Sequence, residues 1–224
     1  MPRNAPKKPR QHNLRGTPYE RVVKEERLWL IKQGRAPTGL GPKGGKERTL
    51  QRYSELFRMD LRAAIGKRIA ALKARKRPRP VALLDLGMGK GIAAAEIKKA
   101  FGKSVFVCGI DFKRHAGKAA IDSVRVGDFD TFRNERFARK GGKQFGGKFD
   151  FIFSVFGPTY YSPTPLYSIE KAIGLLAKGG EFFFQVDKHK VTYPQPVREI
   201  AKRNGCEIWV GEAGNYYNFR IKKR

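Results

Sequence analysis

Acidic residues, cysteine and long apolar runs are all scarce in this sequence of 224 residues. No apolar run approaches the roughly 18 residues that a membrane-spanning helix needs, so we expect no membrane-spanning segment and no membrane partner. No short apolar signal segment opens the chain. We therefore expect a cytoplasmic protein, and import into an organelle is the less favoured alternative.

Cysteine is limited to two residues, Cys108 and Cys206, and both fall inside predicted strands. Such cysteines behave as small, buried apolar side chains in a reducing compartment. A hydrophobic content of 40% and an aromatic content of 12% indicate a globular protein. The length suits one domain with a substantial core and an appendage.

Negative charge is the most marked shortage. There are 48 Lys and Arg residues against 20 Asp and Glu, which gives a formal net charge of +28. Residues 1–80 hold 23 of the basic and 6 of the acidic residues, a net charge of +17. A positive field of this strength attracts polyanions. A solvated surface is the alternative, but so large an excess favours nucleic acid as the partner, as structured RNA or ribonucleoprotein.

Residues 1–46 are predicted to form a basic segment apart from the main domain. The first 16 residues contain three prolines and no acid, and they predict an arm that becomes ordered on RNA. Thr17 opens a predicted helix, and Gly34 closes it. Residues 34–46 hold five glycines and two prolines, which favours a flexible linker, with a phosphate-binding loop as the alternative. The main domain is therefore expected over residues 47–224.

Apolar residues at intervals of three and four predict a helix over residues 47–76, which Gly66 kinks or splits. The basic run at its end, residues 73–79, is interpreted either as a phosphate contact or as a solvated face. Farther along, the pattern predicts a helix over residues 165–177, a turn at Gly179–Gly180 and a strand over residues 181–186. A last helix over residues 196–204 precedes a hairpin of residues 206–211 and 216–221.

The stretch V-A-L-L-D-L-G-M-G-K-G, residues 81–91, predicts a buried strand and a glycine loop, with a helix over residues 92–101 behind them. A sharp turn from strand to helix needs a positive φ, and a ligand reaches the backbone only where no Cβ intervenes. The N-terminus of the helix offers free N–H groups.

Carboxylates follow the next two predicted strands. Asp111 ends a strand over residues 105–110, and Asp128 follows a strand over residues 123–126. Asp111 lies 24 residues after Gly87, where an acid is placed to bind the two hydroxyls of a ribose.

These stretches resemble motifs of the class I S-adenosylmethionine-dependent methyltransferases: D-L-G-M-G-K-G at 85–91, G-I-D-F at 109–112 and V-G-D-F at 126–129. The resemblance continues with F-D-F-I-F-S-V-F at 149–156 and A-I-G-L-L-A-K-G-G-E-F-F-F at 172–184, and it spans residues 60–224. It implies a Rossmann-like α/β fold with a mostly parallel seven-stranded sheet that ends in an antiparallel C-terminal hairpin. A dinucleotide or mononucleotide fold is the alternative, but the spacing departs from G-x-G-x-x-G, and Gly91 stands where a P-loop has Ser or Thr.

The resemblance also implies S-adenosylmethionine as the cofactor. The glycine loop would cradle the methionine part, and Asp85 would support the loop and meet the amino group. Asp111 would bind the ribose, and Asp128 with Phe129 would bind the adenine. The implied cofactor-binding residues are Asp85, Gly87, Met88, Gly89, Gly91, Asp111, Phe112, Asp128, Phe129 and Ser154. No metal ligands are predicted.

The loop after the predicted fourth strand would border the methyl acceptor, because ligands bind beyond the carboxyl ends of parallel strands. Its acceptor-site candidates are Ser154, Phe156, Tyr160 and Tyr161, and the three aromatic rings suit stacking on a base. Ordinary loop packing is the alternative. His189 is a candidate base, but no general base is assigned.

Known acceptor motifs are missing from this sequence. The Asn/Asp-Pro-Pro-Tyr motif of adenine amino-group methylation, a cysteine nucleophile near the fourth or fifth strand and the Asp of the ribose-methylation tetrad are all absent. An RNA methyltransferase acting on ribosomal or transfer RNA is the favoured hypothesis. A non-catalytic, methyltransferase-like RNA-binding or ribosome-associated protein is the first alternative, and a methyltransferase for a protein or small molecule is the second.

Overall fold

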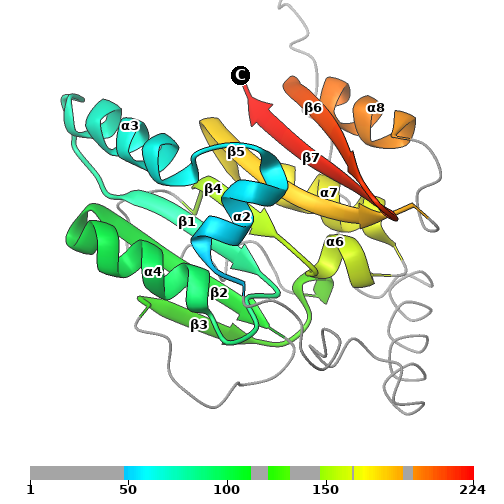
Figure 1. Cartoon of the computed structure of the whole chain (residues 1–224). Helices are drawn as coiled ribbons and strands as arrows, with labels where there is room; N and C mark the ends of the chain where they lie inside the picture. Colours follow the sequence, from blue (N-terminus) through cyan, green and yellow to red (C-terminus); the bar gives the residue numbers. More distant parts are fainter. Residues whose placement is uncertain (1–47, 112–120, 132–146, 163, 189–193) are drawn as a thin grey trace, which may run out of the picture. The chain divides into compact units, whose positions relative to one another are not determined.

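The computed structural model describes residues 48–111, 121–131, 147–162, 164–188 and 194–224 (Figure 1). The chain forms two compact units, Met1–Thr38 and Gly39–Arg224, and every described residue belongs to the second. The predicted N-terminal arm, helix and linker over residues 1–46 lie outside the described residues, so that division stays a prediction.

A seven-stranded sheet in the order β3-β2-β1-β4-β5-β7-β6 forms the centre of the second unit. β1, β2, β3, β4 and β5 pair in parallel, whereas β7 runs antiparallel to both β5 and β6. The strands are β1 (Val81–Leu86), β2 (Val105–Asp111), β3 (Ser123–Val126), β4 (Phe149–Ser154), β5 (Leu176–Asp187), β6 (Cys206–Ala213) and β7 (Tyr216–Lys223). This arrangement confirms the predicted fold class.

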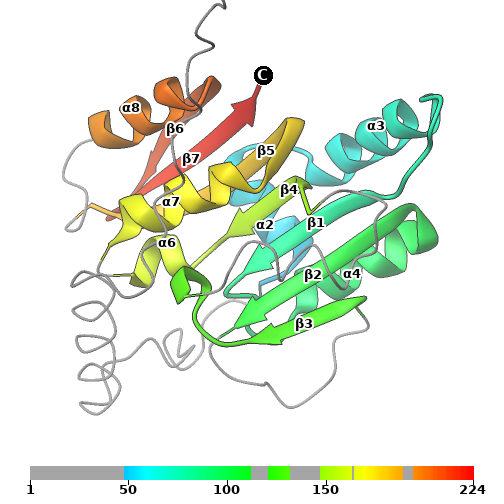
Figure 2. The same cartoon turned by 180° about the vertical axis from the view of Figure 1, so that it is seen from behind.

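Helices cover both faces of the sheet. α2 (Leu50–Phe57), α3 (Leu61–Lys73) and α4 (Ile92–Phe101) lie on the face turned to the viewer in Figure 1. α7 (Pro165–Gly174) and α8 (Gln195–Arg203) lie on the face that Figure 2 shows. The short helix α6 (Pro158–Tyr161) follows β4, and two 3₁₀ turns are η1 (Gly102–Ser104) and η2 (Phe129–Thr131).

Alternating side chains of the buried strands supply the two cores. In β1, Leu83 faces the core under α2, α3 and α4, while Leu84 faces the core under α7 and α8. Because both faces of β1 are covered, all six of its residues are buried, as expected for a central parallel strand.

The prediction of one helix over residues 47–76, kinked or split at Gly66, is wrong, because the segment forms two helices separated at residues 58–60. The chain leaves α2 at Arg58, which adopts a left-handed conformation with φ of 49°, and α3 begins after Asp60. The Asp60 carboxylate caps α3 by accepting the Ala63 N–H at 2.9 Å. Gly66 lies inside α3 and does not interrupt it.

The predicted turn at Gly179–Gly180 is also wrong, because both glycines belong to β5, which begins at Leu176. The register with β4 shifts between Phe149 and Phe151, so the strand bulges at this point. A Cβ on Gly180 would lie 2.8 Å from the Phe149 carbonyl oxygen, which explains the need for glycine here.

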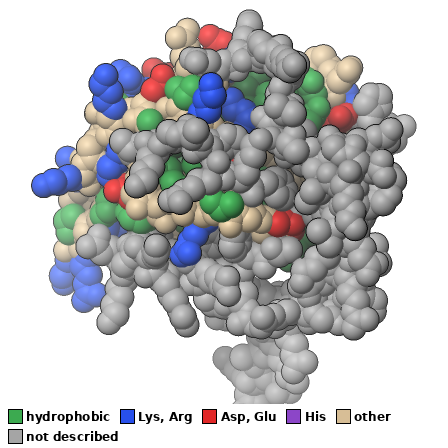
Figure 3. Space-filling model, turned by 90° about the horizontal axis from the view of Figure 1, so that it is seen from below, with side chains coloured by type: hydrophobic (Ala, Val, Ile, Leu, Met, Phe, Trp, Pro, Cys, Tyr) green, Lys and Arg blue, Asp and Glu red, His purple; other side chains and the backbone are tan. Residues whose placement is uncertain are grey.

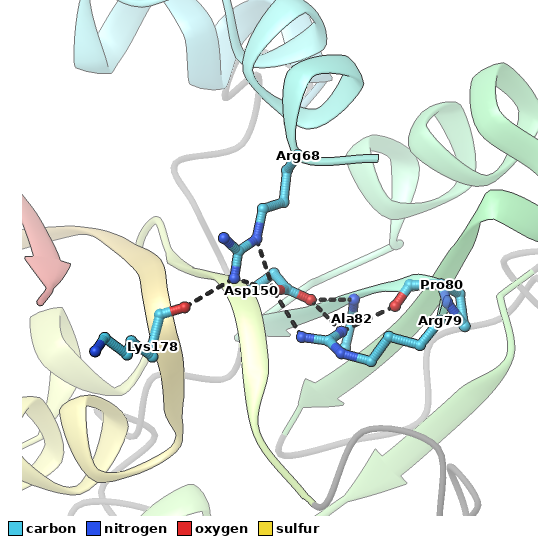
Figure 4. Close-up of polar contacts among 6 residues, drawn as sticks. All are labelled: Arg68, Arg79, Pro80, Ala82, Asp150 and Lys178. Atoms are coloured by element: carbon cyan, nitrogen blue, oxygen red, sulfur yellow. Dashed lines mark hydrogen bonds and ion pairs between the residues drawn. The ribbon is translucent and has the colours of Figure 1, made fainter. Parts of the chain in front are cut away.

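The amino ends of the strands are joined by a buried carboxylate, Asp150 of β4 (Figure 4). It pairs with Arg68 of α3 at 2.7 Å and with Arg79, just before β1, at 2.6 Å, and it accepts the Ala82 N–H at 2.9 Å. Burial disfavours the charged form, but these hydrogen bonds and the arginine charges outweigh it and hold the pKa of Asp150 below its ordinary value. Arg79 is therefore an internal ion-pair partner, unlike the exposed remainder of the basic run.

Two further findings concern the composition. Cys108 and Cys206 are unpaired thiols inside strands β2 and β6, as predicted, but only Cys108 is buried and Cys206 is half-buried. Burial raises the pKa of Cys108 to about 12. Within the described ranges, no helix combines the length and the apolar character needed to cross a membrane.

Candidate functional site

The glycine loop joins β1 to α4 and lies at the carboxyl ends of the parallel strands (Figure 1). Gly87, Gly89 and Gly91 all have positive φ, at 76°, 57° and 72°. The Gly87 and Met88 N–H groups donate to the Ile110 carbonyl at 2.8 and 3.1 Å, which holds the loop against the end of β2. The predicted conformational requirement for glycine is therefore present at all three positions.

The glycines differ in what surrounds them. A Cβ on Gly87 would lie 2.6 Å from Cα of Gly157, so Gly87 is needed where the β1 and β4 loops touch. Gly157 is equally confined, because its Cβ would lie 2.0 Å from the Leu86 carbonyl oxygen. A Cβ on Gly89 would meet only the Arg48 guanidinium, at 3.6 Å. Gly89 therefore faces the Arg48 side chain, whereas Gly87 faces the backbone of Gly157.

Asp111 lies at the tip of β2 and contacts the glycine loop directly. Its Oδ2 accepts the Gly89 N–H at 2.7 Å, and its side chain is buried. The structure therefore brings together the loop and the acid that the sequence placed 24 residues apart. An ionised carboxylate can accept several hydrogen bonds at once.

Asp85 is buried beneath the loop and pairs with a helix that the motif did not include. The Tyr53 hydroxyl of α2 donates to Oδ1 and Oδ2 of Asp85, both at 3.3 Å. Burial, with a smaller contribution from Asp111, raises the pKa of Asp85 to about 7, against the lowering effects of Arg48 and the Tyr53 hydrogen bond. Burial therefore shifts Asp85 toward its neutral form.

Arg48 lies over the same loop and was not identified from the sequence. Its Nη1 donates to the Gly87 carbonyl, and its Cζ lies 5.7 Å from the centre of the Phe156 ring. Its own carbonyl accepts the Ala93 N–H at 3.0 Å, so one N–H of the first turn of α4, predicted to be free, is occupied. The Leu50 N–H donates to Glu96 of α4 at 2.6 Å, which fixes the start of α2 across the loop.

The predicted adenine-side residues have distinct environments. Asp128 accepts the Asp130 N–H at 2.9 Å, which shapes the turn after β3. The Phe129 ring is buried in the core, with Lys171 Nζ 5.0 Å from its centre, and its carbonyl accepts from the same Nζ at 2.6 Å, so its part in binding adenine stays a prediction. Phe112 lies outside the described residues.

The Met88 side chain is buried against β2, so its predicted role at the cofactor stays a prediction. A Cβ on Gly109 would lie 2.0 Å from the Met88 sulfur, so Gly109 makes the space that this side chain occupies. The sequence signal for this contact was the glycine inside an otherwise apolar strand.

On the acceptor side, Ser154 is fully buried. Its hydroxyl accepts from Thr159 Oγ1 at 2.9 Å, and the same Thr159 hydroxyl lies 2.9 Å from the Gln185 carbonyl. These contacts join β4, α6 and β5 and leave Ser154 no exposed surface, so its use at the site stays a prediction. Neither the Tyr161 side chain nor His189 belongs to the described part.

Three half-buried rings form a cluster next to Arg48. Phe156 lies 5.3 Å from Tyr160 and 5.9 Å from Tyr216, and Tyr160 lies 5.6 Å from Tyr216, all edge to face. Phe156 has φ of 50°, a conformation that is costly for a bulky residue and that often accompanies a functional site. Tyr216 comes from β7, and its part in the cluster was not expected from the sequence.

Comparison with known proteins gives a match in structure only. Neither a family model nor a curated protein matches the sequence. The plantazolicin methyltransferase BamL, in complex with a triazolic desmethylPZN analog and SAH, matches with a TM-score of 0.51 and 13% identity over 91% of this chain and 98% of that chain. The plantazolicin methyltransferase BpumL, with the same ligands, matches with a TM-score of 0.50 and 12% identity over 92% and 98%. At identities this low, the two matches show a shared fold alone.

Proposed function

We propose that this chain, which has the class I methyltransferase fold, is an S-adenosylmethionine-dependent methyltransferase that acts on RNA. The carrying observation is the joint placement of the glycine loop and Asp111, with the Gly89 N–H bonded to the carboxylate at 2.7 Å. In an open parallel sheet, ligands bind at this edge, where the strands end.

The residues at this edge fit the cofactor. The Asp111 carboxylate suits the two ribose hydroxyls, because both are donors and an ionised carboxylate is only an acceptor. Asp85 lies below the loop and suits the amino group of the methionine part, whose positive charge would favour the ionised acid. When bound, S-adenosylmethionine supplies a methyl group already activated on a sulfonium. The protein then has mainly to align the donor and the acceptor.

RNA is favoured as the acceptor by charge and by the aromatic cluster. Figure 3 shows Lys and Arg side chains at several places on the described part of one face, and the whole chain has a net charge of +28. Lys73, Arg75, Lys76 and Arg77 are exposed, and within the described part of the chain none of them forms an ion pair. The rings of Phe156, Tyr160 and Tyr216 provide a surface on which a base could stack.

Two measurements test the proposal. Calorimetric titration with S-adenosylmethionine is expected to show binding that Asp111→Asn weakens about tenfold or more, since hydrogen bonds to a charged acceptor are each worth about 1.5–3 kcal/mol. Glu212→Gln, an exposed carboxylate of the edge strand β6, removes the same charge four strands away from β1 and is the control. Failure of the unmodified protein to bind the donor at millimolar concentration would favour a non-catalytic RNA-binding protein.

The acceptor is tested by transfer of a labelled methyl group to total RNA and to total protein in parallel. We expect label in RNA that depends on the enzyme and is lost in Asp111→Asn. Label in protein alone would refute RNA as the acceptor while leaving the donor site intact. Mapping the labelled nucleotide then identifies the target.

A further inference from the structure

Arg48 is a half-buried cation that acts on the buried Asp85 only through its charge and forms no ion pair with a described residue. Its one described side-chain hydrogen bond goes to the Gly87 carbonyl. A guanidinium has five N–H donors in a planar fork, so most of its hydrogen-bonding capacity is unused here. Partly buried charges are normally paired, and this one lies directly over the predicted cofactor loop.

The carboxylates nearest to Arg48 are engaged elsewhere. Asp111 accepts the Gly89 N–H at 2.7 Å, and Asp85 is bonded to the Tyr53 hydroxyl at 3.3 Å. Asp85 is also buried, and among the described residues no carboxylate is hydrogen-bonded to the fork of Arg48, which can therefore donate to an anionic ligand.

Several contacts hold Arg48 in this position. Its carbonyl is bonded to the Ala93 N–H of α4 at 3.0 Å, and the next residue, Thr49, caps α2 by accepting the Arg52 N–H at 3.1 Å. The guanidinium is then bounded by the Phe156 ring, with Cζ 5.7 Å from the ring centre, and by Gly89. Atoms Nη1 and Cζ lie 3.6 and 3.8 Å from where a Cβ on Gly89 would be. The absence of a side chain at Gly89 therefore leaves the guanidinium open to the loop.

We propose that Arg48 binds the α-carboxylate of the methionine part of the cofactor. The inference rests on the proposed function, since it requires the cofactor at this loop. A carboxylate matches the planar fork of arginine with two parallel hydrogen bonds. In this arrangement the two charges of the methionine part meet opposite partners, the amino group at Asp85 and the carboxylate at Arg48.

The test compares two ligands that differ only in this carboxylate, S-adenosylmethionine and decarboxylated S-adenosylmethionine. Affinities are measured by calorimetry for the unmodified protein, Arg48→Gln, Arg48→Lys and the control Arg52→Gln. Arg52 lies one turn away on α2 in an exposed pair with Glu55, so its loss removes the same charge without touching the loop. Thermal unfolding of each variant reports whether the fold is retained.

For Arg48→Gln we expect affinity for S-adenosylmethionine to fall about ten- to a hundredfold, the range for a hydrogen-bonded charge pair. Affinity for the decarboxylated ligand should change less than about twofold, and Arg48→Lys should recover part of the loss because it keeps the charge without the fork. Arg52→Gln should behave like the unmodified protein with both ligands.

Three outcomes would overturn the inference. Equal losses for the two ligands would make Arg48 a structural support of the loop. Unchanged affinity for both, combined with weaker RNA binding by Arg48→Gln, would assign the guanidinium to an RNA phosphate. If Arg48→Gln changes neither the affinity for the two ligands nor the binding of RNA, Arg48 binds no anionic ligand. Failure of the proposed function itself is distinguishable, because the unmodified protein would then bind neither ligand.

Discussion

Replacing Asp85 with Asn is expected to stabilise the protein at alkaline pH and to change little at acidic pH. The folded protein raises the pKa of this carboxyl from 3.8 to about 7, chiefly through burial. The unfolded chain therefore ionises Asp85 at a lower pH than the folded protein does. As pH rises from about 4 to about 7, the neutral acid's contribution to folding is lost.

The magnitude follows from the size of the shift. A raise from 3.8 to about 7 corresponds to roughly 4 kcal/mol once both states are ionised, as an order of magnitude. Asn keeps the shape of the side chain and an oxygen that accepts from Tyr53, but it carries no charge at any pH. The free energy of unfolding of Asp85→Asn should therefore exceed that of the unmodified protein by about 3–4 kcal/mol at pH 8, and by well under 1 kcal/mol at pH 4.

Urea unfolding followed by far-ultraviolet circular dichroism measures this difference. Both proteins are unfolded at several values between pH 4 and pH 8, and only the difference between them is used, because other titrating groups then cancel. A difference that stays constant with pH would refute the assigned burial of an ionisable Asp85. If the stability of the variant relative to the unmodified protein falls as pH rises, the folded protein favours the charged form of Asp85, contrary to the prediction.

Three further predictions concern other parts of the structure. Asp150→Asn should show the opposite pH dependence to Asp85→Asn. It destabilises by about 3–5 kcal/mol at neutral pH, because it leaves two partly buried arginines without their ion pair, and the loss shrinks as acid protonates Asp150 in the unmodified protein. Gly157→Ala should cost about 2 kcal/mol or more in urea unfolding, since its Cβ would lie 2.0 Å from the Leu86 carbonyl oxygen, whereas Gly66→Ala, with nothing within 4 Å, should stabilise α3 by about 0.5–1 kcal/mol. Equal effects of the two alanines would contradict the packing at Gly157. Tyr216→Leu should raise the KM for RNA about tenfold through the loss of one stacking ring, without altering donor affinity, and an unchanged KM would remove this ring from the acceptor site.

The sequence was most informative where a chemical requirement is local. The three glycines of the loop and the acid at the tip of β2 follow from the backbone turn and from strand order, and the structure brings Gly89 and Asp111 into contact. The sheet topology follows from the same blocks taken in order.

Long-range contacts were not accessible from the sequence. Tyr53 meets Asp85 across 32 residues, and Arg48 meets Gly87 across 39, and no local pattern marks either pair. The spacing of apolar residues places Tyr53 on the apolar side of a helix, and nothing local marks its hydroxyl as the partner of a buried acid. The break after α2 does have a local sign, because Asp60 caps the helix that begins at Leu61. The prediction placed the break at Gly66 instead.

The contact between Gly87 and Gly157 has a consequence for how the two loops respond to their ligands. At this point the loop after β1 and the loop after β4 touch through bare main chain, with no side chain between them to absorb a displacement. Any shift of one loop is therefore transmitted sterically to the other. If the loop after β1 binds the methyl donor and the loop after β4 borders the acceptor, the two loops would move together. A substitution that increases the mobility of one loop should then weaken binding at both.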